Sequence, residues 1–399
     1  MPIILTINAG SSSVKYQCFE MTDEVCLAKG QVDRLGSSSP NLFYERHDGT
    51  THQTNVPPME YEAVFPSIFE ILLDTEKGIL QNLNDIVAVG HRVVHGGSRF
   101  AESALITPEV ETAINQCVPL APLHNPYNLG GIRACRQALP NAAYVAVFDT
   151  AFHQTMPDYA YMYALPRSLH ERYGIRRYGF HGTSHQYVST RAAEILGRPL
   201  TSLKLITCHL GNGCSITAVD QGKSVDTSMG LTPLEGLMMG TRCGDIDPAI
   251  IFHLMEEGQM SADAINQMLN RESGLLGVSG IASDVRDLLH AVSEDNSQAI
   301  LALQMFSYRV RQYIGKYAAI LGGLDALIFT AGIGENASSI RATICENLDF
   351  LGVHLDEERN QSSEVEKAIH QADAPVKLLV IPTNEELMIA RDTLRLIGG

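Results

Sequence analysis

Short apolar runs alternate with longer stretches of helical periodicity along this chain. Branched and aromatic residues fill residues 142–148 (AAYVAVF), 203–210 (LKLITCHL) and 324–332 (LDALIFTAG), and turn or polar residues end each run, which predicts strands. Residues 297–321 carry apolar side chains at helical spacing and predict one long, largely buried helix. The alternation indicates an α/β architecture.

Two segments half a chain apart repeat one pattern. Residues 4–19 (ILTINAGSSSVKYQCF) and 205–220 (LITCHLGNGCSITAVD) both read as a strand, a glycine-containing polar turn and a second strand. Gly10 and Gly211 lie 201 residues apart in a chain of 399. A duplicated domain gives that spacing, with one hairpin turn from each half, and a chance likeness is the alternative.

Bulk properties limit the classes of function. A chain of 399 residues predicts two domains, and its formal net charge of −16 disfavours nucleic acid or an anionic membrane as a general partner. The sequence has no leader pattern, and the apolar stretch 318–333 is too broken to span a bilayer. Its eight cysteines form no C-x-x-C pair, which favours reduced thiols in the cytoplasm. Residues 35–41 and 47–58 are expected to be polar loops.

Three glycine-containing turns are candidate phosphate-binding sites. Residues 8–15 (NAGSSSVK) lack Walker A spacing, and strand-like residues follow them, so a hairpin turn with donors from Ser11, Ser13 and Lys15 is expected. Residues 209–213 (HLGNG) form the second turn, and residues 329–337 pass from a strand through Gly332-Ile333-Gly334 into a helix entered at Glu335-Asn336. A plain polar turn is the alternative for each, but three turns together favour a nucleotide cleft.

Several polar and charged side chains stand at positions typical of catalytic or substrate-binding residues. Arg92 and Arg242 have glycine neighbours or apolar lead-ins, and a surface salt bridge is the alternative for each. Asp149 ends an apolar strand, where a helix cap is the alternative. His181 lies among small residues, whereas His185 is expected to be a satisfied core histidine.

Two acidic residues stand where a strand passes into the final helix. Glu385 and Glu386 follow Asn384 at this junction; a carboxylate that faces Mg²⁺ is the functional interpretation, and a helix cap with acidic first-turn residues is the alternative.

Together these segments resemble the acetate kinase family, which includes propionate kinases. The matching pieces run in order over the whole chain: NAGSSSVKY, GHRVVHGG, PLAPLHNP, VFDTAFHQTMP, RYGFHGTSH, HLGNG, DTSMGLTPLEGLMMGTR, SGI-SD-RD (residues 279–287), AGIGEN and IPTNEELMIARDT. The resemblance implies a duplicated ribonuclease-H-like fold of the actin, sugar kinase and Hsp70 type, with ATP in an interdomain cleft. We expect an N-terminal domain of residues 1–150 plus 386–399 and a nucleotide-binding domain of residues 151–385.

The resemblance also assigns roles residue by residue. Asn8 and Glu385 correspond to Mg²⁺ positions, where Mn²⁺ is a possible substitute, and Asp149, His181, Arg242 and Arg92 correspond to catalytic positions. Arg92 also binds the substrate carboxylate beside an acyl pocket of Val94, Leu123, Phe180 and Pro233. ATP or ADP is expected at Ser11, Ser13, Lys15, His209, Leu210, Gly211, Asn212, Gly213, Asp284, Val285, Arg286, Gly332, Ile333, Gly334, Glu335 and Asn336.

The implied reaction is reversible, direct in-line transfer of a phosphoryl group from ATP to acetate, giving acetyl phosphate and ADP. Asp149 is expected to orient an arginine or a metal-bound water. Val94 predicts a short pocket that favours acetate, with a propionate kinase as the alternative. A rival of another class is an actin-like or Hsp70-like ATPase, which Arg92, Arg242 and His181 disfavour. Family likeness also implies a cytoplasmic homodimer.

Overall fold

The computed structural model describes residues 2–57 and 63–398, and the chain divides into two compact units. Unit 1 runs as far as Gln154 and resumes at Asn384, whereas unit 2 is Thr155–Thr383. These breaks lie near the expected domain boundaries at 150 and 385, which stay an expectation. Glu385 falls in unit 1.

Unit 1 is built on one sheet with the strand order β5-β4-β3-β2-β1-β6-β8-β7. Its strands are β1 (Ile3–Ala9), β2 (Ser13–Glu20), β3 (Val25–Asp33), β4 (Asn41–Arg46), β5 (Thr51–Asn55), β6 (Ile86–Val93), β7 (Ala104–Leu105) and β8 (Ala143–Phe148). Its helices are α1 (Val64–Leu73), α2 (Pro108–Gln116), α3 (Asn125–Ala138) and α15 (Glu385–Ile397).

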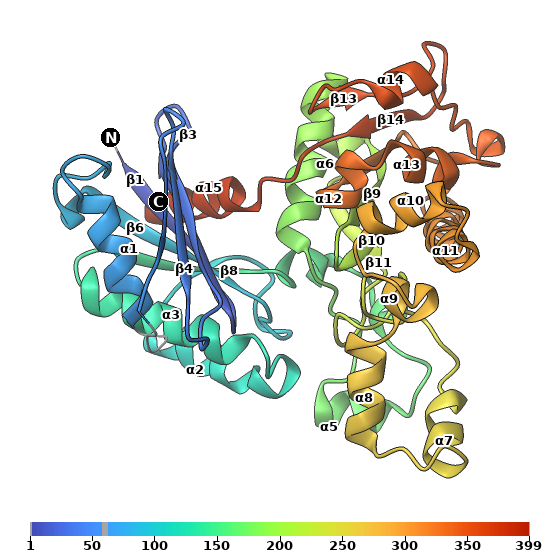
Figure 1. Ribbon diagram of the computed structural model, residues 1–399, viewed down its shortest axis with the longest axis horizontal. Coiled ribbons are helices and arrows are strands. Elements are labelled where there is room, and N and C mark those ends of the chain that lie inside the picture. The colour runs from blue at the N-terminus through green and yellow to red at the C-terminus, as the bar shows by residue number, and fades with distance from the viewer. Residues whose placement is uncertain (1, 58–62, 399) are drawn as a thin grey trace. The chain divides into compact units, whose positions relative to one another are not determined.

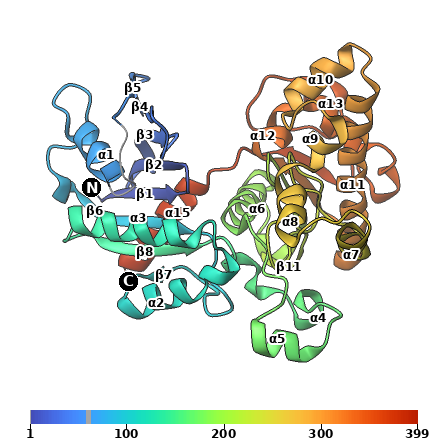
Figure 2. The ribbon, with the colours of Figure 1, turned by 60° about the horizontal axis from the view of Figure 1, so that its bottom comes forward.

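The two faces of this sheet are covered by different helices (Figures 1 and 2). Along β8, Ala146 and Phe148 belong to the core cluster that α1 and α3 share with the sheet. Val145 and Val147 point the other way and pack with Ile389 of α15. Side chains alternate across a strand, so a wholly apolar β8 is buried on both faces.

The expectation of a polar loop over 47–58 is wrong for residues 51–55. These residues form β5, which pairs antiparallel with β4 from Asn41↔Asn55 to Glu45↔Thr51. The segment is an edge strand with almost every side chain exposed, so it lacks the apolar alternation by which strands are predicted. Residue 58 lies outside the described residues.

Unit 2 is built on a second sheet, with the order β11-β10-β9-β12-β14-β13. Its strands are β9 (Lys204–Leu210), β10 (Cys214–Asp220), β11 (Lys223–Thr227), β12 (Ala326–Thr330), β13 (Lys367–Ala368) and β14 (Lys377–Val380). Its helices are α4 (Asp158–Tyr161), α5 (Arg167–Tyr173), α6 (Gly182–Leu196), α7 (Ala249–Glu256), α8 (Ala262–Arg271), α9 (Gly274–Ser279), α10 (Val285–Ser293), α11 (Ser297–Leu321), α12 (Ala331–Asn336), α13 (Ser338–Cys345) and α14 (Glu357–Gln361). Figure 1 shows α6 and α11 on opposite sides of this sheet.

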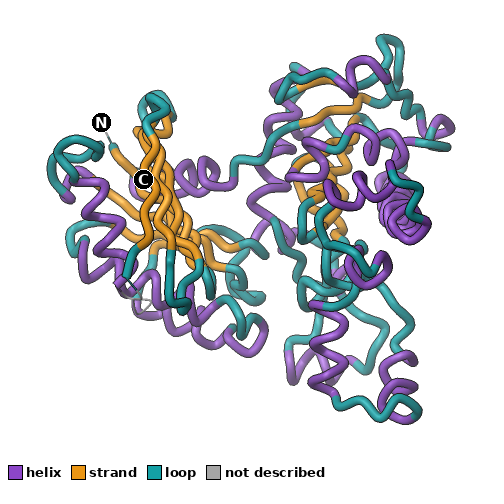
Figure 3. The backbone as a smooth tube through the Cα atoms, in the orientation of Figure 1, coloured by secondary structure: helices purple, strands orange, loops and turns teal. Residues whose placement is uncertain are grey.

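The two sheets share one topology, which confirms the duplicated ribonuclease-H-like fold. In unit 1, β3-β2-β1 are antiparallel and β1-β6-β8 are parallel. In unit 2, β11-β10-β9 are antiparallel and β9-β12-β14 are parallel. Figure 3 shows the strands of each unit gathered into their own sheet. The repeated turns at Gly10 and Gly211 therefore occupy equivalent places, between the first and second strand of each unit.

The predicted helix over 297–321 is α11, with the same bounds. Asn296 caps its first turn by accepting from the backbone N–H of Gln298 and Ala299, and the left-handed Gly322 ends it. It is buried along one face only, because Leu301, Met305 and Tyr308 are exposed. In the part of the chain that the structure describes, every helix is too short or too polar to cross a membrane.

Candidate active site

The hairpin turn predicted at Gly10 is present between β1 and β2, and its phosphate-binding role stays a prediction. Asn8 pairs with Lys15 across the hairpin, and the N–H of Gly10 donates to the carbonyl of Ser13 at 2.8 Å. Ser11 and Lys15 are exposed, and Ser13 is half-buried. Two hydroxyls and an ammonium group thus stand on a tight turn, ready to meet anionic oxygens.

Beside this turn, Arg92 is fixed by two partners. Its Nε and Nη2 donate to Oδ1 and Oδ2 of Asp149 at 2.9 and 2.5 Å, and its Nη1 donates to Oδ1 of Asn8 at 3.2 Å. The Asp149 side chain is 1% exposed and that of Arg92 is 20% exposed. The surface salt bridge considered for Arg92 is therefore not what forms, because the pair is mostly shielded from water. Asp149 does orient an arginine.

A second carboxylate, that of Glu385, faces the same arginine. Its Oε2 lies 3.9 Å from Nε of Arg92. Burial raises the pKa of Glu385 to about 7; Arg92 and Lys15 oppose the rise, whereas Asp149 and Glu386 add to it. The helix cap considered at this junction is made by Asn384, whose side chain accepts from the N–H of Leu387 at 3.0 Å. Glu385 and Glu386 lie in the first turn of α15, where acidic side chains also support a helix start.

In unit 2, the β9–β10 turn brings a histidine and an arginine to one glycine. The N–H of Gly211 donates to the carbonyl of Gly213 at 3.1 Å, which closes the turn. A Cβ placed on Gly213 would lie 3.5 Å from Nη1 of Arg242 and 3.7 Å from Nε2 of His181. His181 has a left-handed backbone, with φ of 55°, directly before α6. Two donor side chains therefore converge on the backbone of the HLGNG segment.

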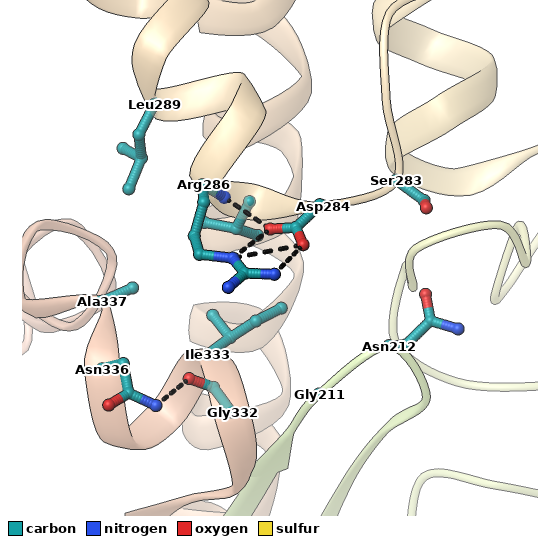
Figure 4. Close-up of a pocket in the computed structure, with 11 residues that line it drawn as sticks. Gly211, Asn212, Ser283, Asp284, Arg286, Leu289, Gly332, Ile333, Asn336 and Ala337 are labelled. Carbon is teal, nitrogen blue, oxygen red and sulfur yellow. Dashed lines mark hydrogen bonds and ion pairs between the residues drawn. The ribbon is translucent and has the colours of Figure 1, made fainter. Parts of the chain in front are cut away.

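A cavity of about 860 Å³ opens next to this turn (Figure 4). In it, the guanidinium of Arg286 donates to both carboxylate oxygens of Asp284, with Nη2 to Oδ2 at 2.6 Å. These hydrogen bonds from the side chain and backbone of Arg286 lower the pKa of Asp284 to about 2. Residues from three segments of the chain line the cavity: Gly211, Asn212, Ser283, Asp284, Val285, Arg286, Leu289, Gly332, Ile333, Asn336 and Ala337.

The third turn differs from expectation in one respect. The helix begins at Ala331 and not at Glu335, so Gly332–Asn336 lie inside α12. The Glu335 carboxylate folds back and accepts from the N–H of Ala331 at 2.7 Å and of Thr383 at 3.2 Å. Gly334 and Glu335 thus do not line the cavity, whereas Gly332, Ile333 and Asn336 do.

A buried arginine that we did not predict holds this turn from behind. Nη1 of Arg341 donates to the carbonyls of Gly334 and Glu335, both at 2.9 Å, and Nε donates to Oδ1 of Asn360 at 2.8 Å. Arg341 is 1% exposed. Its partners come from two segments of the chain, so local sequence carries no signal for this role.

The loop that carries Pro233 and Arg242 is held by a second unpredicted arginine. Nη2 of Arg177 donates to Oε1 of Glu235 at 2.5 Å, and its Nη1 donates to the carbonyl of Ser228 at 2.9 Å. The hydroxyl of Tyr163 also donates to Glu235. Arg177 and Glu235 both lie in segments that resemble the acetate kinase family, and this resemblance is the sequence feature by which they could have been found.

The residues expected to form an acyl pocket divide between the units. Val94 is buried in unit 1, where Leu123 is 60% exposed just before α3. Phe180 is buried in unit 2, where Pro233 is half-buried. Their common role as a pocket stays a prediction.

Two relatives that match over nearly the whole chain are both named acetate kinase. A protein from Dictyoglomus thermophilum named acetate kinase is 54% identical over 395 residues, which cover 99% of each chain. An acetate kinase from Halothermothrix orenii is 55% identical over 396 residues, again 99% of each chain.

Solved structures agree with this likeness. The crystal structure of Porphyromonas gingivalis acetate kinase matches with a TM-score of 0.96 at 45% identity, covering 100% of both chains. A propionate kinase from Francisella tularensis matches with a TM-score of 0.93 at 44% identity, covering 99% of this chain and 100% of the other. The sequence model of the acetokinase family matches residues 3–391. This chain belongs to the acetokinase family.

Proposed function

We propose that this protein transfers the γ-phosphoryl group of ATP to acetate, giving acetyl phosphate and ADP in a reversible, direct in-line step. The observation that carries the proposal is the whole-length match, at 54% identity, to a protein named acetate kinase. The charged and polar side chains described above within each unit supply the groups that this chemistry requires.

The reaction demands charge neutralisation more than proton transfer. A simple carboxylic acid has a pKa of about 4, so acetate is already a nucleophilic anion at neutral pH and needs no general base. The difficulty lies in bringing two anions together and holding them in line, so catalysis consists of positioning and electrostatic stabilisation.

In unit 1, Arg92 binds the carboxylate. A guanidinium has five N–H donors, and three of those of Arg92 are used by Asp149 and Asn8 in the described part of the chain. Two donors remain for substrate oxygens, and the bidentate bond to Asp149 sets the plane in which they point. Asp149 is then a positioning residue for Arg92 and takes no proton.

In unit 2, His181 and Arg242 meet the transferring phosphoryl group. Both approach Gly213, so a phosphoryl oxygen near this backbone can receive hydrogen bonds from Nη1 of Arg242 and Nε2 of His181. Donors fixed before the reaction stabilise charge on the equatorial oxygens without reorganising.

ATP and ADP occupy the cavity bounded by Asn212, Asp284–Arg286 and Ile333. Leu289 and Ile333 offer apolar surface for a base, and Asp284 and Asn336 offer polar groups for a ribose. The Arg286–Asp284 bond keeps a cation at the rim, where it can reach the phosphate chain. Ser11, Ser13 and Lys15 serve the phosphates from unit 1.

Asn8 and Glu385 offer an amide oxygen and a carboxylate oxygen, which fit an octahedral, partly hydrated cation such as Mg²⁺, with Mn²⁺ as a substitute. Burial is the main cause of the raised pKa of Glu385, and Asp149 and Glu386 add to it, so a cation bound beside this carboxylate would favour its ionised form. The described residues contain no group of three or more His, Cys, Asp and Glu side chains placed to hold a metal. Two protein oxygens suit Mg²⁺, which keeps several waters and takes ligands from phosphates. When bound, it neutralises charge on the phosphates.

A propionate kinase is the second candidate, because a protein of that name is 44% identical. Val94 favours acetate, since it leaves less room than alanine or glycine would, although one methylene in an apolar pocket is worth only about 1–3 kcal/mol.

A cytoplasmic homodimer completes the proposal. All eight cysteines are free thiols, as in a reducing compartment. Helix α7 exposes Phe252 and Met255, which lie three residues apart and so on one face, and an apolar face of this kind fits a second copy of the chain. Analytical ultracentrifugation of the wild type and Phe252→Glu tests it: a dimer that dissociates in the variant is expected, and a wild-type monomer contradicts it.

Trapping of acyl phosphate with hydroxylamine tests the reaction. Purified protein is incubated with ATP, Mg²⁺ and, separately, acetate, propionate and butyrate. The strongest hydroxamate signal with acetate supports the proposal, and the strongest signal with propionate moves the assignment to the second candidate. ADP release without a carboxylate and without hydroxamate would reject both.

A further inference from the structure

A continuous chain of buried hydrogen bonds runs behind His181. Its Nδ1 lies 2.9 Å from Oγ of Ser215, and the same oxygen lies 2.7 Å from Nε2 of His185. Nδ1 of His185 lies 2.7 Å from Oγ1 of Thr207. Thr207, His185 and Ser215 are each 0% exposed. Two strands and one helix of unit 2 thus place a hydroxyl, an imidazole and a second hydroxyl in series with the His181 ring.

The proton positions in this chain follow from counting donors. The side-chain oxygen of Thr207 has one hydrogen-bond partner among the described residues, which is Nδ1 of His185. A buried hydroxyl that only accepted from His185 would leave its own proton unpaired, which is unfavourable. Thr207 therefore donates and Nδ1 of His185 accepts. In a neutral ring the proton then lies on Nε2.

The same count continues to His181. Nε2–H of His185 donates to Oγ of Ser215, so the single hydroxyl proton of Ser215 is available for Nδ1 of His181. That nitrogen accepts, and the proton of the neutral His181 ring must lie on Nε2.

We propose that Thr207, His185 and Ser215 form a relay that fixes the tautomer and orientation of His181, with Nδ1 accepting from Ser215 and Nε2–H turned to the substrate side. His185 and Ser215 are positioning residues, acting through His181. For catalysis the proposal rests on the proposed function, since phosphoryl oxygens only accept hydrogen bonds and an Nε2–H donor matches them.

Other groups around the ring agree with this assignment. The His209 ring stacks on His181 at 4.1 Å between centroids, and its Nδ1 bonds Oγ of Ser184 at 2.8 Å, outside the relay. Arg242 is the charged group that approaches the same backbone at Gly213. Both neighbours can hold the ring in place, but neither bonds Nδ1 of His181 in these contacts, so the tautomer is set by Ser215.

The tautomer can be observed without any catalytic assay. Long-range ¹H–¹⁵N NMR of the full-length protein, labelled at the histidine ring nitrogens and held at pH 8, distinguishes a protonated from an unprotonated ring nitrogen. His181→Gln assigns the signal. The relay predicts an unprotonated Nδ1 and a protonated Nε2 for His181. A protonated Nδ1 in the wild type overturns the proposal, whether or not the protein proves to be a kinase.

Two buried threonines provide a matched pair of variants. Thr207 and Thr217 face each other in register on β9 and β10, both are 0% exposed, and Thr217 bonds Thr227 instead of the relay. In Thr207→Val and Ser215→Ala, we expect the NMR spectrum to show a population of His181 with a protonated Nδ1. Thr217→Val should leave the His181 signals unchanged.

Kinetics separate positioning from folding. Ser215→Ala is expected to lower kcat by about tenfold or more with the KM for ATP within about twofold. Thr217→Val keeps the wild-type kcat. Wild-type tautomer and kcat in both Ser215→Ala and Thr207→Val would overturn the relay. If Ser215→Ala does not fold, Thr207→Val and the wild-type spectrum still decide.

Discussion

Arg92 and Asp149 form a two-point pair, with Nε to Oδ1 at 2.9 Å and Nη2 to Oδ2 at 2.5 Å. The arginine comes from the end of β6 and the aspartate directly follows the neighbouring parallel strand β8. Parallel strands deliver their carboxyl ends to one edge of a sheet, and the pair forms at that edge. A guanidinium held at two points presents its remaining donors in a fixed plane.

Asp149→Asn tests whether this pair positions the acceptor. The asparagine amide has the size of the carboxylate, but its NH₂ group cannot accept a hydrogen bond from the guanidinium. Arg92 therefore keeps only one of its two bonds to this side chain, and its orientation is no longer fixed. We expect kcat/KM for acetate to fall about a hundredfold, with the KM for ATP nearly unchanged. Glu111→Gln, which weakens the Glu111–Arg136 pair of the same unit, is the control and keeps its activity. A loss under threefold in Asp149→Asn would contradict the positioning role.

Arg242→Ala removes a cation from the transferring phosphoryl group. We expect kcat to fall about a thousandfold or more, as when an arginine finger is removed, and Arg242→Lys to recover only part of the rate. Steady-state kinetics with saturating ATP and acetate measure it, with the exposed Arg271→Ala as control. A loss of less than tenfold would remove Arg242 from the mechanism.

Gly240→Ala tests the nucleotide turn. A Cβ at this position would lie 2.0 Å from Oδ1 of Asn212, so the amide of Asn212, which lines the nucleotide cavity, must move. Its far end can swing out, so folding is retained while the KM for ATP rises by about fivefold or more. Gly315→Ala, whose Cβ meets nothing within 4 Å, should leave the KM unchanged. An unchanged KM in Gly240→Ala would place Asn212 outside the nucleotide site.

Val94→Ala tests the size of the acyl pocket. Removing two methyl groups makes room for one methylene, so the ratio of kcat/KM for propionate to that for acetate should rise about tenfold. Val93→Ala is a matched control, because the adjacent Val93 is buried in the core of unit 1 and should change stability without changing the ratio. An unchanged ratio in Val94→Ala means that Val94 does not limit acyl length.

We expect the buried histidine His91 to make the folded protein less stable as the pH falls. Burial, aided by the charge of Arg136, lowers its pKa from 6.5 to about 3. Below pH 6.5 this histidine is protonated in the unfolded chain but stays neutral in the folded protein. Its contribution to the free energy of unfolding is therefore fully present above pH 6.5 and is lost as the pH falls toward 3. Between pH 7.5 and pH 5 this loss amounts to about 2 kcal/mol.

Denaturant unfolding at both pH values measures this effect. His91→Leu should reduce the difference between them by about that amount, whereas the exposed His47→Asn should not. Equal pH dependence in the wild type and His91→Leu would show that another group titrates.

The hydrophobic pattern of the sequence predicted those helices and turns that are determined by residues close together in the chain. The apolar periodicity of 297–321 and its caps at Asn296 and Gly322 define α11 to the residue. The turns at Gly10 and Gly211 could be placed because small polar residues interrupt apolar strands. The edge strand β5 was missed because it has no buried face to impose an alternation.

Long-range partners could not be predicted from the sequence. Arg341 is buried because carbonyls of α12 and Asn360 meet it, and no spacing in the sequence records that meeting. His185 was interpreted as a satisfied core histidine, which its bonds to Thr207 and Ser215 confirm. Its connection to His181 became visible only when β9, β10 and α6 were packed together.

The most direct test of the proposed function is ³¹P NMR of the protein with ATP, Mg²⁺ and acetate in one tube. The proposal predicts that ADP and acetyl phosphate appear together in equal amounts, and that neither forms when acetate is omitted. Appearance of ADP with inorganic phosphate, at a rate independent of acetate, would contradict it and assign the nucleotide site to an ATPase.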